Sequence, residues 1–151
     1  MKTFLLKGKQ PIIKFSMLPD NTFFEGTIPD GYSLAICPSN ERQIVVDVDK
    51  REGGKNGFNS IPKNILKELE KTFNYPTKSG GKHFFLNYTG LELLKNTSTL
   101  EGIDLRIGKN KKTGNNGGYV RYNHPEDIRN CLHFINNTSL ELNKWLELLF
   151  T

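Results

Sequence analysis

The segment IVVDVD, residues 44–49, constrains the fold of this chain more than any other stretch. Consecutive Ile and Val residues bounded by polar segments favour a buried β-strand. Side chains alternate between the two faces of a strand, so Val46 and Val48 point to one face. Asp47 and Asp49 then point to the other face, roughly 6.5–7 Å apart along the chain. Two like charges at this spacing need a positive partner, and a divalent cation with carboxylate ligands would provide it.

Interspersed strand and helix patterns along the 151 residues indicate an α+β fold. A chain of this length favours a single domain, here residues 1–151. Ser60 and Pro62 form a helix start signal, and apolar residues keep helical spacing as far as Phe73. Besides 44–49, strands are expected at residues 11–15, 32–36, 82–86, 102–107 and 118–122.

Two short C-terminal helices are expected within about residues 125–150, packed on the sheet. Pro125 opens the first, because the acidic residues that follow suit the positive end of a helix dipole. Thr138 or Ser139 caps the second. The apolar stripe of the second helix is a core feature formed by Leu142, Trp145, Leu146 and Leu149.

Charge and cysteine content narrow the functional class. The net charge of +5 is a mild indication of a polyanionic partner. Cys37 and Cys131 are too few for a disulfide framework, so we expect a cytoplasmic protein. No stretch has the length and hydropathy of a membrane span, and the N-terminal apolar run is too short for a signal peptide, so no membrane partner is expected.

Two further segments carry side chains that complement the acidic pair. In SGGKH, residues 79–83, glycines let the backbone approach a bulky ligand, and His83 can donate to a phosphate. In GIDLR, residues 102–106, Asp104 and Arg106 alternate with apolar residues and so share one strand face. The Gly- and Asn-rich loop that follows contains Lys109, Lys111 and Lys112.

These residues together suit phosphoryl transfer. Carboxylates at i and i+2 plus a third from a neighbouring strand form a reasonable cage for two divalent ions, which lower the charge of the attacking and leaving oxygens. We expect His83 and Arg106 to bind a triphosphate. Each motif alone is weak: Asp-x-Asp is common, a lone His is more often structural, and the lysine loop is equally compatible with a solvated hairpin. His124 and His133 are assigned no role.

The order hhhDhD, helix, SGGKH, GIDLR and GGYV resembles the archaeo-eukaryotic primase superfamily, specifically the primase-polymerase (Prim-Pol) domain of phage and plasmid replication proteins. The resemblance covers most of the chain and implies an RRM-like catalytic sheet flanked by helices. It implies that two Mg²⁺ or Mn²⁺ ions are held by the catalytic carboxylates Asp47, Asp49 and Asp104. The nucleotide-binding residues expected in this arrangement are His83, Arg106, Ser79, Gly81 and Lys82, of which Lys82 is the weaker candidate because a regular strand turns it away from His83.

The resemblance implies template-dependent nucleotidyl transfer by a DNA primase, a DNA polymerase or both. The expected partners are a single-stranded DNA template and NTPs or dNTPs, in the cytoplasm of a bacterial host if the chain is viral. The template or primer backbone is expected to contact Lys109, Lys111 and Lys112. The sequence departs from the family after GGYV, where RYNHP replaces a Pro-Pro-Ser-type stretch. No helicase or zinc-binding cysteine cluster is present, so either a separate helicase is a partner or the enzyme is minimal.

Two alternatives stay open. The chain could be a non-catalytic replication accessory protein that binds single-stranded DNA or a replisome partner, although an intact carboxylate trio argues against it. It could also be a metal-dependent nuclease, although such enzymes more often carry a Glu-x-Lys beside the Asp.

Overall fold

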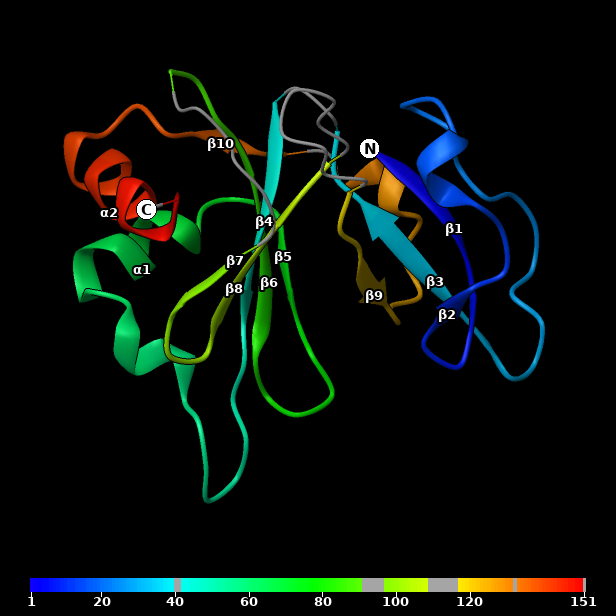
Figure 1. Ribbon diagram of the computed structural model, residues 1–151, viewed down its shortest axis with the longest axis horizontal. Helices are drawn as coiled ribbons and strands as arrows, with labels where there is room; N and C mark the ends of the chain where they lie inside the picture. The colour runs from blue at the N-terminus through cyan, green and yellow to red at the C-terminus, as the bar shows by residue number, and fades with distance from the viewer. Residues whose placement is uncertain (40–41, 91–96, 109–116, 132, 151) are drawn as a thin grey trace.

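The computed structural model describes residues 1–39, 42–90, 97–108, 117–131 and 133–150 of the chain. It has an α+β fold in which two sheets lie side by side and both helices cover the far face of the larger sheet (Figure 1). The larger sheet therefore lies between the helices and the smaller sheet. Within the described residues, neither helix has the length and hydropathy of a membrane-spanning segment.

The smaller sheet has the strand order β2-β1-β3-β9, and its paired strands are antiparallel. Its strands are β1 (Lys2–Lys7), β2 (Gln10–Pro11), β3 (Tyr32–Cys37) and β9 (Val120–Tyr122).

The larger sheet has the order β10-β6-β4-β8-β7, and β5 pairs with β6 on the same side as β10. Its strands are β4 (Gln43–Val48), β5 (Asn74–Pro76), β6 (Lys82–Asn87), β7 (Thr97–Leu100), β8 (Ile103–Ile107) and β10 (Ile135–Asn136). Among the described strands only β10 runs parallel to its neighbour. The strands predicted at 32–36, 44–49, 82–86, 102–107 and 118–122 are confirmed within one or two residues at each end. The strand predicted at 11–15 is wrong, because β2 ends at Pro11 and Phe15 begins a 3₁₀ turn.

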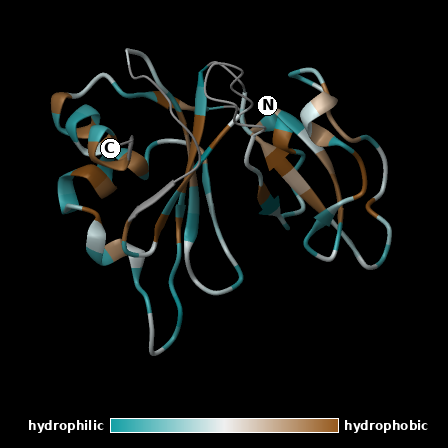
Figure 2. Ribbon diagram, in the orientation of Figure 1, coloured by the Kyte–Doolittle hydropathy of each residue, from teal (hydrophilic) through white to brown (hydrophobic). Residues whose placement is uncertain are grey.

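The alternation of side chains along β4 divides the core as predicted. Val46 and Val48 pack against the helices, in a cluster that includes Ile65 and Leu146. Val45 faces the smaller sheet and packs in a second cluster. Figure 2 shows the hydrophobic residues concentrated along the central strands and on the helices. Both faces of β4 carry buried apolar residues. The polar residues Asp47 and Asp49 lie at the end of the strand and just beyond it.

Helix α1 (Lys63–Leu69) forms after Pro62 as expected, but it is shorter than its apolar spacing suggested. The expected hydroxyl cap is wrong, because the Ser60 hydroxyl donates to the carbonyl of Glu101. The helical pattern to Phe73 is also wrong. The backbone N–H of Phe73 donates to the carbonyl of His133, and the carbonyl of Phe73 accepts from Phe85, so tertiary backbone pairing replaces the last helical turn.

Of the two predicted C-terminal helices, only the second forms. The helix expected at Pro125 is wrong: this segment forms only the 3₁₀ turn Ile128–Asn130 and leads into β10. The second helix is confirmed as α2 (Leu140–Phe150), and the Ser139 hydroxyl accepts a hydrogen bond from the backbone N–H of Leu142, as a cap does.

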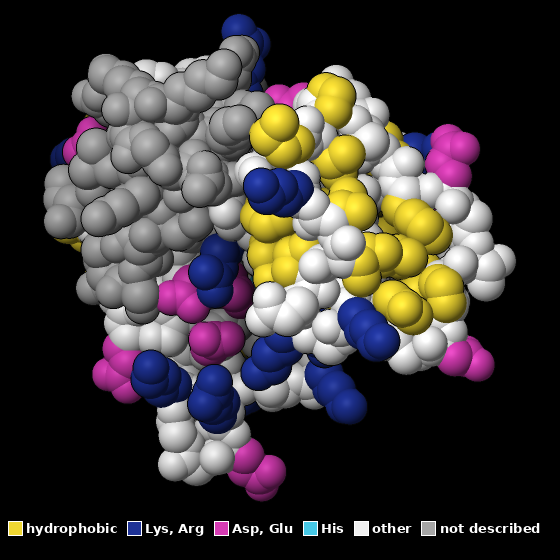
Figure 3. Space-filling model, turned by 45° about the vertical axis from the view of Figure 1, so that its right-hand side comes forward, with side chains coloured by type: hydrophobic (Ala, Val, Ile, Leu, Met, Phe, Trp, Pro, Cys, Tyr) yellow, Lys and Arg dark blue, Asp and Glu magenta, His cyan; other side chains and the backbone are white. Residues whose placement is uncertain are grey.

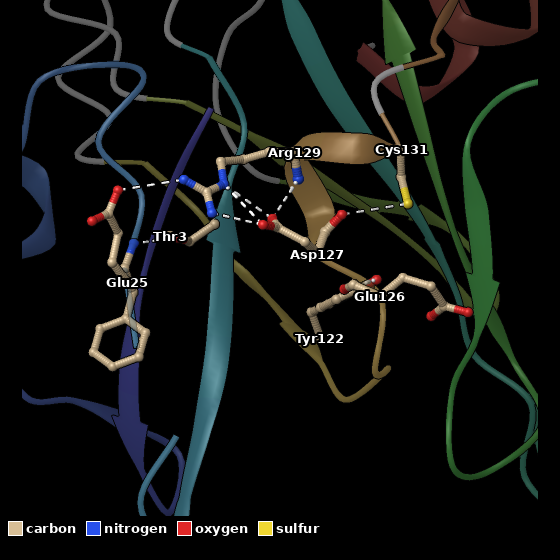
Figure 4. A network of polar contacts seen from close by, with 8 residues as sticks. Thr3, Glu25, Tyr122, Glu126, Asp127, Arg129 and Cys131 are labelled. Carbon is tan, nitrogen blue, oxygen red and sulfur yellow. Dashed lines mark hydrogen bonds and ion pairs between the residues drawn. The ribbon is translucent and has the colours of Figure 1, made fainter. Parts of the chain in front are cut away.

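A polar network explains why the segment after β9 stays non-helical (Figure 4). The side chain of Asp127 accepts from the backbone N–H of Arg129 and forms an ion pair with its guanidinium at 2.7 Å. The same guanidinium lies 3.4 Å from a carboxylate oxygen of Glu25. The Tyr122 hydroxyl donates to the carbonyl of Glu126. These bonds satisfy polar groups locally, so the short turn competes with a longer helix.

Candidate active site

Strand register brings polar side chains from four strands into one row. Asp47 on β4 pairs with His83 on β6 and with Asp104 on β8. On the far side of β6, His83 pairs with Tyr75 on β5. Residues directly opposite each other in neighbouring strands point to the same face. The row Tyr75–His83–Asp47–Asp104 therefore lies on one face of the larger sheet, the face turned toward the smaller sheet.

Asp47 is the centre of this row. It is buried, and one of its carboxylate oxygens lies 3.1 Å from Nε2 of His83. Nη2 of Arg106 lies 3.9 Å from the other oxygen and 3.4 Å from Oδ2 of Asp104. Arg106 reaches both acids because it lies two residues beyond Asp104 on the same face of β8, as the alternation predicted. An imidazole and a guanidinium thus compensate the buried acid.

Asp49 follows the end of β4 and is held by its backbone. Its N–H donates to the carbonyl of Gly102 at 2.8 Å, and its own carbonyl accepts from Gly57 at 2.7 Å. A Cβ on Gly57 would lie only 2.2 Å from the carbonyl oxygen of Gly102. Gly102 also has φ +74°, a left-handed conformation that favours glycine. Close contact between these two glycines therefore fixes the position of Asp49 beside the row.

The three carboxylates act on one another electrostatically. Burial raises the pKa of Asp49 above its usual value, and the negative charges of Asp47 and Asp104 raise it further. The positive charges of Arg51 and Arg106 oppose this effect without cancelling it. Burial and the two neighbouring acids therefore disfavour the charged form of Asp49.

Three residues of the row, Tyr75, His83 and Asp47, form the floor of a cleft of about 840 Å³ between the two sheets, whereas Asp104 is not among the residues that line it. Asp47, Asp49 and His83 line it from the larger sheet. The opposite wall and rim are formed by Lys9, Tyr119, Val120, Arg121, Asn123, His124, Pro76, Thr77, Lys78 and Ser79. Figure 3 shows acidic side chains with basic side chains around them in the middle of this face, beside the apolar surface of the N-terminal part.

The donor chemistry of the site suits a divalent cation, but the described side chains are not arranged as a metal cage. Among the residues that the structure describes, no three His, Cys, Asp or Glu side chains are grouped closely enough to hold an ion. The oxygens of Asp47 face His83 and Arg106 instead. Hard carboxylate oxygens are nevertheless the ligands that Mg²⁺ and Mn²⁺ take, and a bound cation would favour the charged form of Asp49, which burial and the neighbouring acids disfavour.

Most of the site residues suggested by the sequence lie together. One face of the sheet carries Asp47, Asp49, Asp104, His83 and Arg106. Strand pairing, ion pairs and electrostatic effects on the pKa of Asp49 connect these residues. Ser79 lines the rim of the same cleft.

Other candidate residues lie elsewhere. Lys82 lies on the helix side of the sheet, where its ammonium pairs with Glu70 at 2.9 Å, away from the acidic row. The close approach that Gly81 permits is to the backbone carbonyl of Val48, which a Cβ would meet at 2.0 Å, rather than to a ligand in the cleft. Lys109, Lys111 and Lys112 lie outside the described residues.

Sequence reasoning missed the residues of the opposite wall. Lys9, Arg121 and His124 line the cleft although no local motif marks them. Tyr119 belongs to the GGYV segment, but nothing in the sequence assigned it a place. Tyr75 lies in a short strand, and only the register of β5 on β6 shows that it touches His83. These positions depend on how the two sheets pack, which single-sequence patterns do not report.

Comparisons with known proteins identified no relative of the chain. No protein-family model, no curated protein and no solved structure matched the chain.

Proposed function

We propose that the chain is a template-dependent nucleotidyltransferase, a DNA primase, a DNA polymerase or both, in the replication of a phage or plasmid. The observation that carries the proposal is the row that joins His83, Asp47 and Asp104 on adjacent strands, with Asp49 next to it. These are the positions that the Prim-Pol resemblance assigns to metal and nucleotide binding. Residues far apart in the sequence therefore lie together on one face of the sheet, which supports the proposal.

The larger sheet is, in this proposal, the RRM-like catalytic sheet of a primase-polymerase domain. Two features of the fold support it. Helices cover one face of a sheet whose central strands are antiparallel, and the acidic row lies on the other face, open to a cleft. A cleft of about 840 Å³ also lies within the usual size range of small-ligand sites, roughly 300–1,000 Å³.

Each polar residue of the row has a part in the proposed reaction. Asp47, Asp49 and Asp104 would hold Mg²⁺ or Mn²⁺, which when bound lowers the negative charge of the attacking and leaving oxygens. His83 and Arg106, which contact Asp47, would donate to the anionic oxygens of the triphosphate. The triphosphate and Asp47 would thus compete for the same donors.

The opposite wall of the cleft supplies positive charge for a nucleic acid. Lys9, Lys78 and Arg121 line the cleft and suit phosphate contacts of a single-stranded DNA template. The lysines at 109, 111 and 112 remain candidates for the same role. A separate helicase as partner and a cytoplasmic location of the enzyme complete the proposal.

The test is nucleotide incorporation on single-stranded DNA, with and without an annealed primer, in Mg²⁺ or Mn²⁺. We expect labelled product from the wild type and only background from Asp47→Ala/Asp49→Ala. The matched control is Glu52→Ala/Glu101→Ala, which removes two exposed acids outside the row. This control should keep the activity of the wild type. Product without a primer identifies a primase, and product only from a primer identifies a polymerase.

Other outcomes would replace the proposal. Metal-dependent shortening of the DNA, lost in the same double variant, would favour the nuclease. Salt-sensitive DNA binding that is equal in the wild type and the double variant, with no synthesis even when a replicative helicase is added, would favour the accessory protein.

A further inference from the structure

The hydroxyl of Tyr75 connects the candidate histidine to the opposite sheet. It lies 2.9 Å from Nδ1 of His83 and 3.0 Å from the backbone carbonyl oxygen of Arg121 on β9. Tyr75 is buried, and its ring packs edge-on against the imidazole with a centroid separation of 5.0 Å. One phenol group thus contacts both the floor and the opposite wall of the cleft.

Hydrogen-bond accounting fixes the direction of these contacts. A backbone carbonyl only accepts, so the Tyr75 hydroxyl donates its single proton to Arg121. The phenol oxygen can then only accept from the imidazole, which requires a proton on Nδ1 of His83. Nε2 faces a carboxylate oxygen of Asp47 at 3.1 Å, on the side of the ring that borders the cleft, and because a carboxylate accepts, Nε2 donates to it.

The surroundings of Tyr75 keep its hydroxyl protonated and its ring in place. Burial raises the pKa of Tyr75 well above its usual value, and the charge of Asp47 and the neighbouring Tyr122 add to the effect. The imidazole of His124 packs 5.0 Å from the Tyr75 ring, and its Nε2 donates to the carbonyl of Pro76, next to Tyr75 on β5. Arg121 on β9 and His124, two positions beyond the end of β9, therefore both hold β5 in place through hydrogen bonds.

We propose that Tyr75 is a positioning residue of the site: its hydroxyl accepts a hydrogen bond from Nδ1 of His83 and so directs Nε2 toward Asp47 and the cleft. The effect on nucleotide binding rests on the proposed function, because His83 is the residue assigned to the triphosphate. The effect on the imidazole does not rest on it. In this arrangement the smaller sheet takes part in the site through the carbonyl of Arg121, which sets the direction of the hydrogen-bond chain.

The test is Tyr75→Phe, which removes only the hydroxyl and keeps the ring. Tyr122→Phe is the matched control, because the Tyr122 hydroxyl also donates to a backbone carbonyl, that of Glu126, and its ring packs 5.0 Å from Tyr75. Two-bond ¹H–¹⁵N NMR spectra of the imidazole nitrogens report which nitrogen carries a proton, and His83→Gln identifies the signal of His83. The affinity for a Mg²⁺–nucleoside triphosphate is measured on the same samples.

In the wild type we expect a protonated Nδ1 on His83. In Tyr75→Phe the imidazole should move toward the tautomer with Nδ1 unprotonated, while Tyr122→Phe should resemble the wild type. Nucleotide affinity should fall about tenfold in Tyr75→Phe, the size typical for loss of a group that orients a ligand-binding histidine. An unprotonated Nδ1 in the wild type, or His83 signals unchanged in Tyr75→Phe, would overturn the role of Tyr75.

The two proposals fail in different ways. If the wild type binds no nucleotide, the proposed function is wrong, and the NMR result still decides whether Tyr75 orients His83. If the wild type binds nucleotide and Tyr75→Phe shifts the tautomer without weakening binding, the positioning role in nucleotide recognition is overturned.

Discussion

The fold disfavours the charged form of Asp49. Its pKa is raised by burial first and by Asp47 and Asp104 second. The folded chain therefore holds the proton of Asp49 more tightly than the unfolded chain does. As pH rises from 3.8, the usual value, through the raised value, the folded state must release that proton, so stability falls over this interval.

Asp49→Asn removes this penalty, so we expect it to stabilise the metal-free protein at pH 7. The half-buried carboxyl is screened by solvent, so the gain should stay below about 1 kcal/mol. Thermal melts from pH 3 to 8 check the sign: the gain should be complete above the raised pKa and vanish below pH 3.8. Asp30→Asn, at an exposed position, is the control.

A divalent cation should reverse the order of stability. Mg²⁺ or Mn²⁺ should raise the melting temperature of the wild type and have little effect on Asp49→Asn, because binding to the folded state alone stabilises it. A wild type that is less stable than Asp49→Asn both with and without the metal would contradict a metal role for Asp49.

At the scale of elements, the connection from β4 to α1 is fixed by contact between backbones. Gly57 and Gly102 approach so closely that a Cβ on Gly102 would lie 2.6 Å from the Cα of Gly57. Asp49 is bonded to both glycines through its backbone. The start of β8 and the hairpin after β4 therefore hold the end of the acidic strand.

Gly102→Ala should destabilise the protein more than Gly53→Ala. Both glycines have a positive φ, +74° and +69°, but nothing lies within 4 Å of a Cβ on Gly53. Each substitution carries the cost of a left-handed alanine, about 1–2 kcal/mol. Backbone overlap should add about 1–3 kcal/mol at Gly102 alone. Urea unfolding measures both variants, and equal losses would show that the close contact contributes nothing.

Helix α2 is held by its apolar stripe. Leu146 is fully buried against the larger sheet, whereas Leu140 at the start of the helix is 63% exposed. Leu146→Ala should cost about 2–5 kcal/mol of unfolding free energy, because it leaves a cavity in the core. Leu140→Ala should change it by about 0.5 kcal/mol or less. Urea unfolding curves for both variants test the assignment, and a small loss in Leu146→Ala would contradict it.

At the scale of the whole molecule, sequence patterns predicted the floor of the cleft, on the larger sheet, and not the opposite wall. The period-two pattern around Asp47 and Asp104 depends only on strand geometry, so it predicted which side chains share a face. Phe73 shows the limit of such patterns. Its spacing predicted a helix, but its backbone instead forms hydrogen bonds with Phe85 and with His133, which is far away in the sequence.

The opposite wall could not be predicted for the same reason. Lys9, Arg121 and His124 reach the cleft because the smaller sheet lies beside the row, and that sheet itself joins segments more than a hundred residues apart, as the Arg121 bond to Gly8 shows. The site belongs to both sheets, so its function depends on their packing as well as on the acidic strand.

Anomalous diffraction from crystals grown with Mn²⁺ and a non-hydrolysable nucleoside triphosphate tests most directly whether this row is a nucleotidyl-transfer centre. We expect Mn²⁺ peaks in contact with Asp47, Asp49 and Asp104, and the triphosphate in contact with His83 and Arg106. Asp104→Asn, treated in the same way, should lose at least one peak. A triphosphate bound elsewhere, or Mn²⁺ that bypasses the three carboxylates while the nucleotide is bound, would contradict the proposed function.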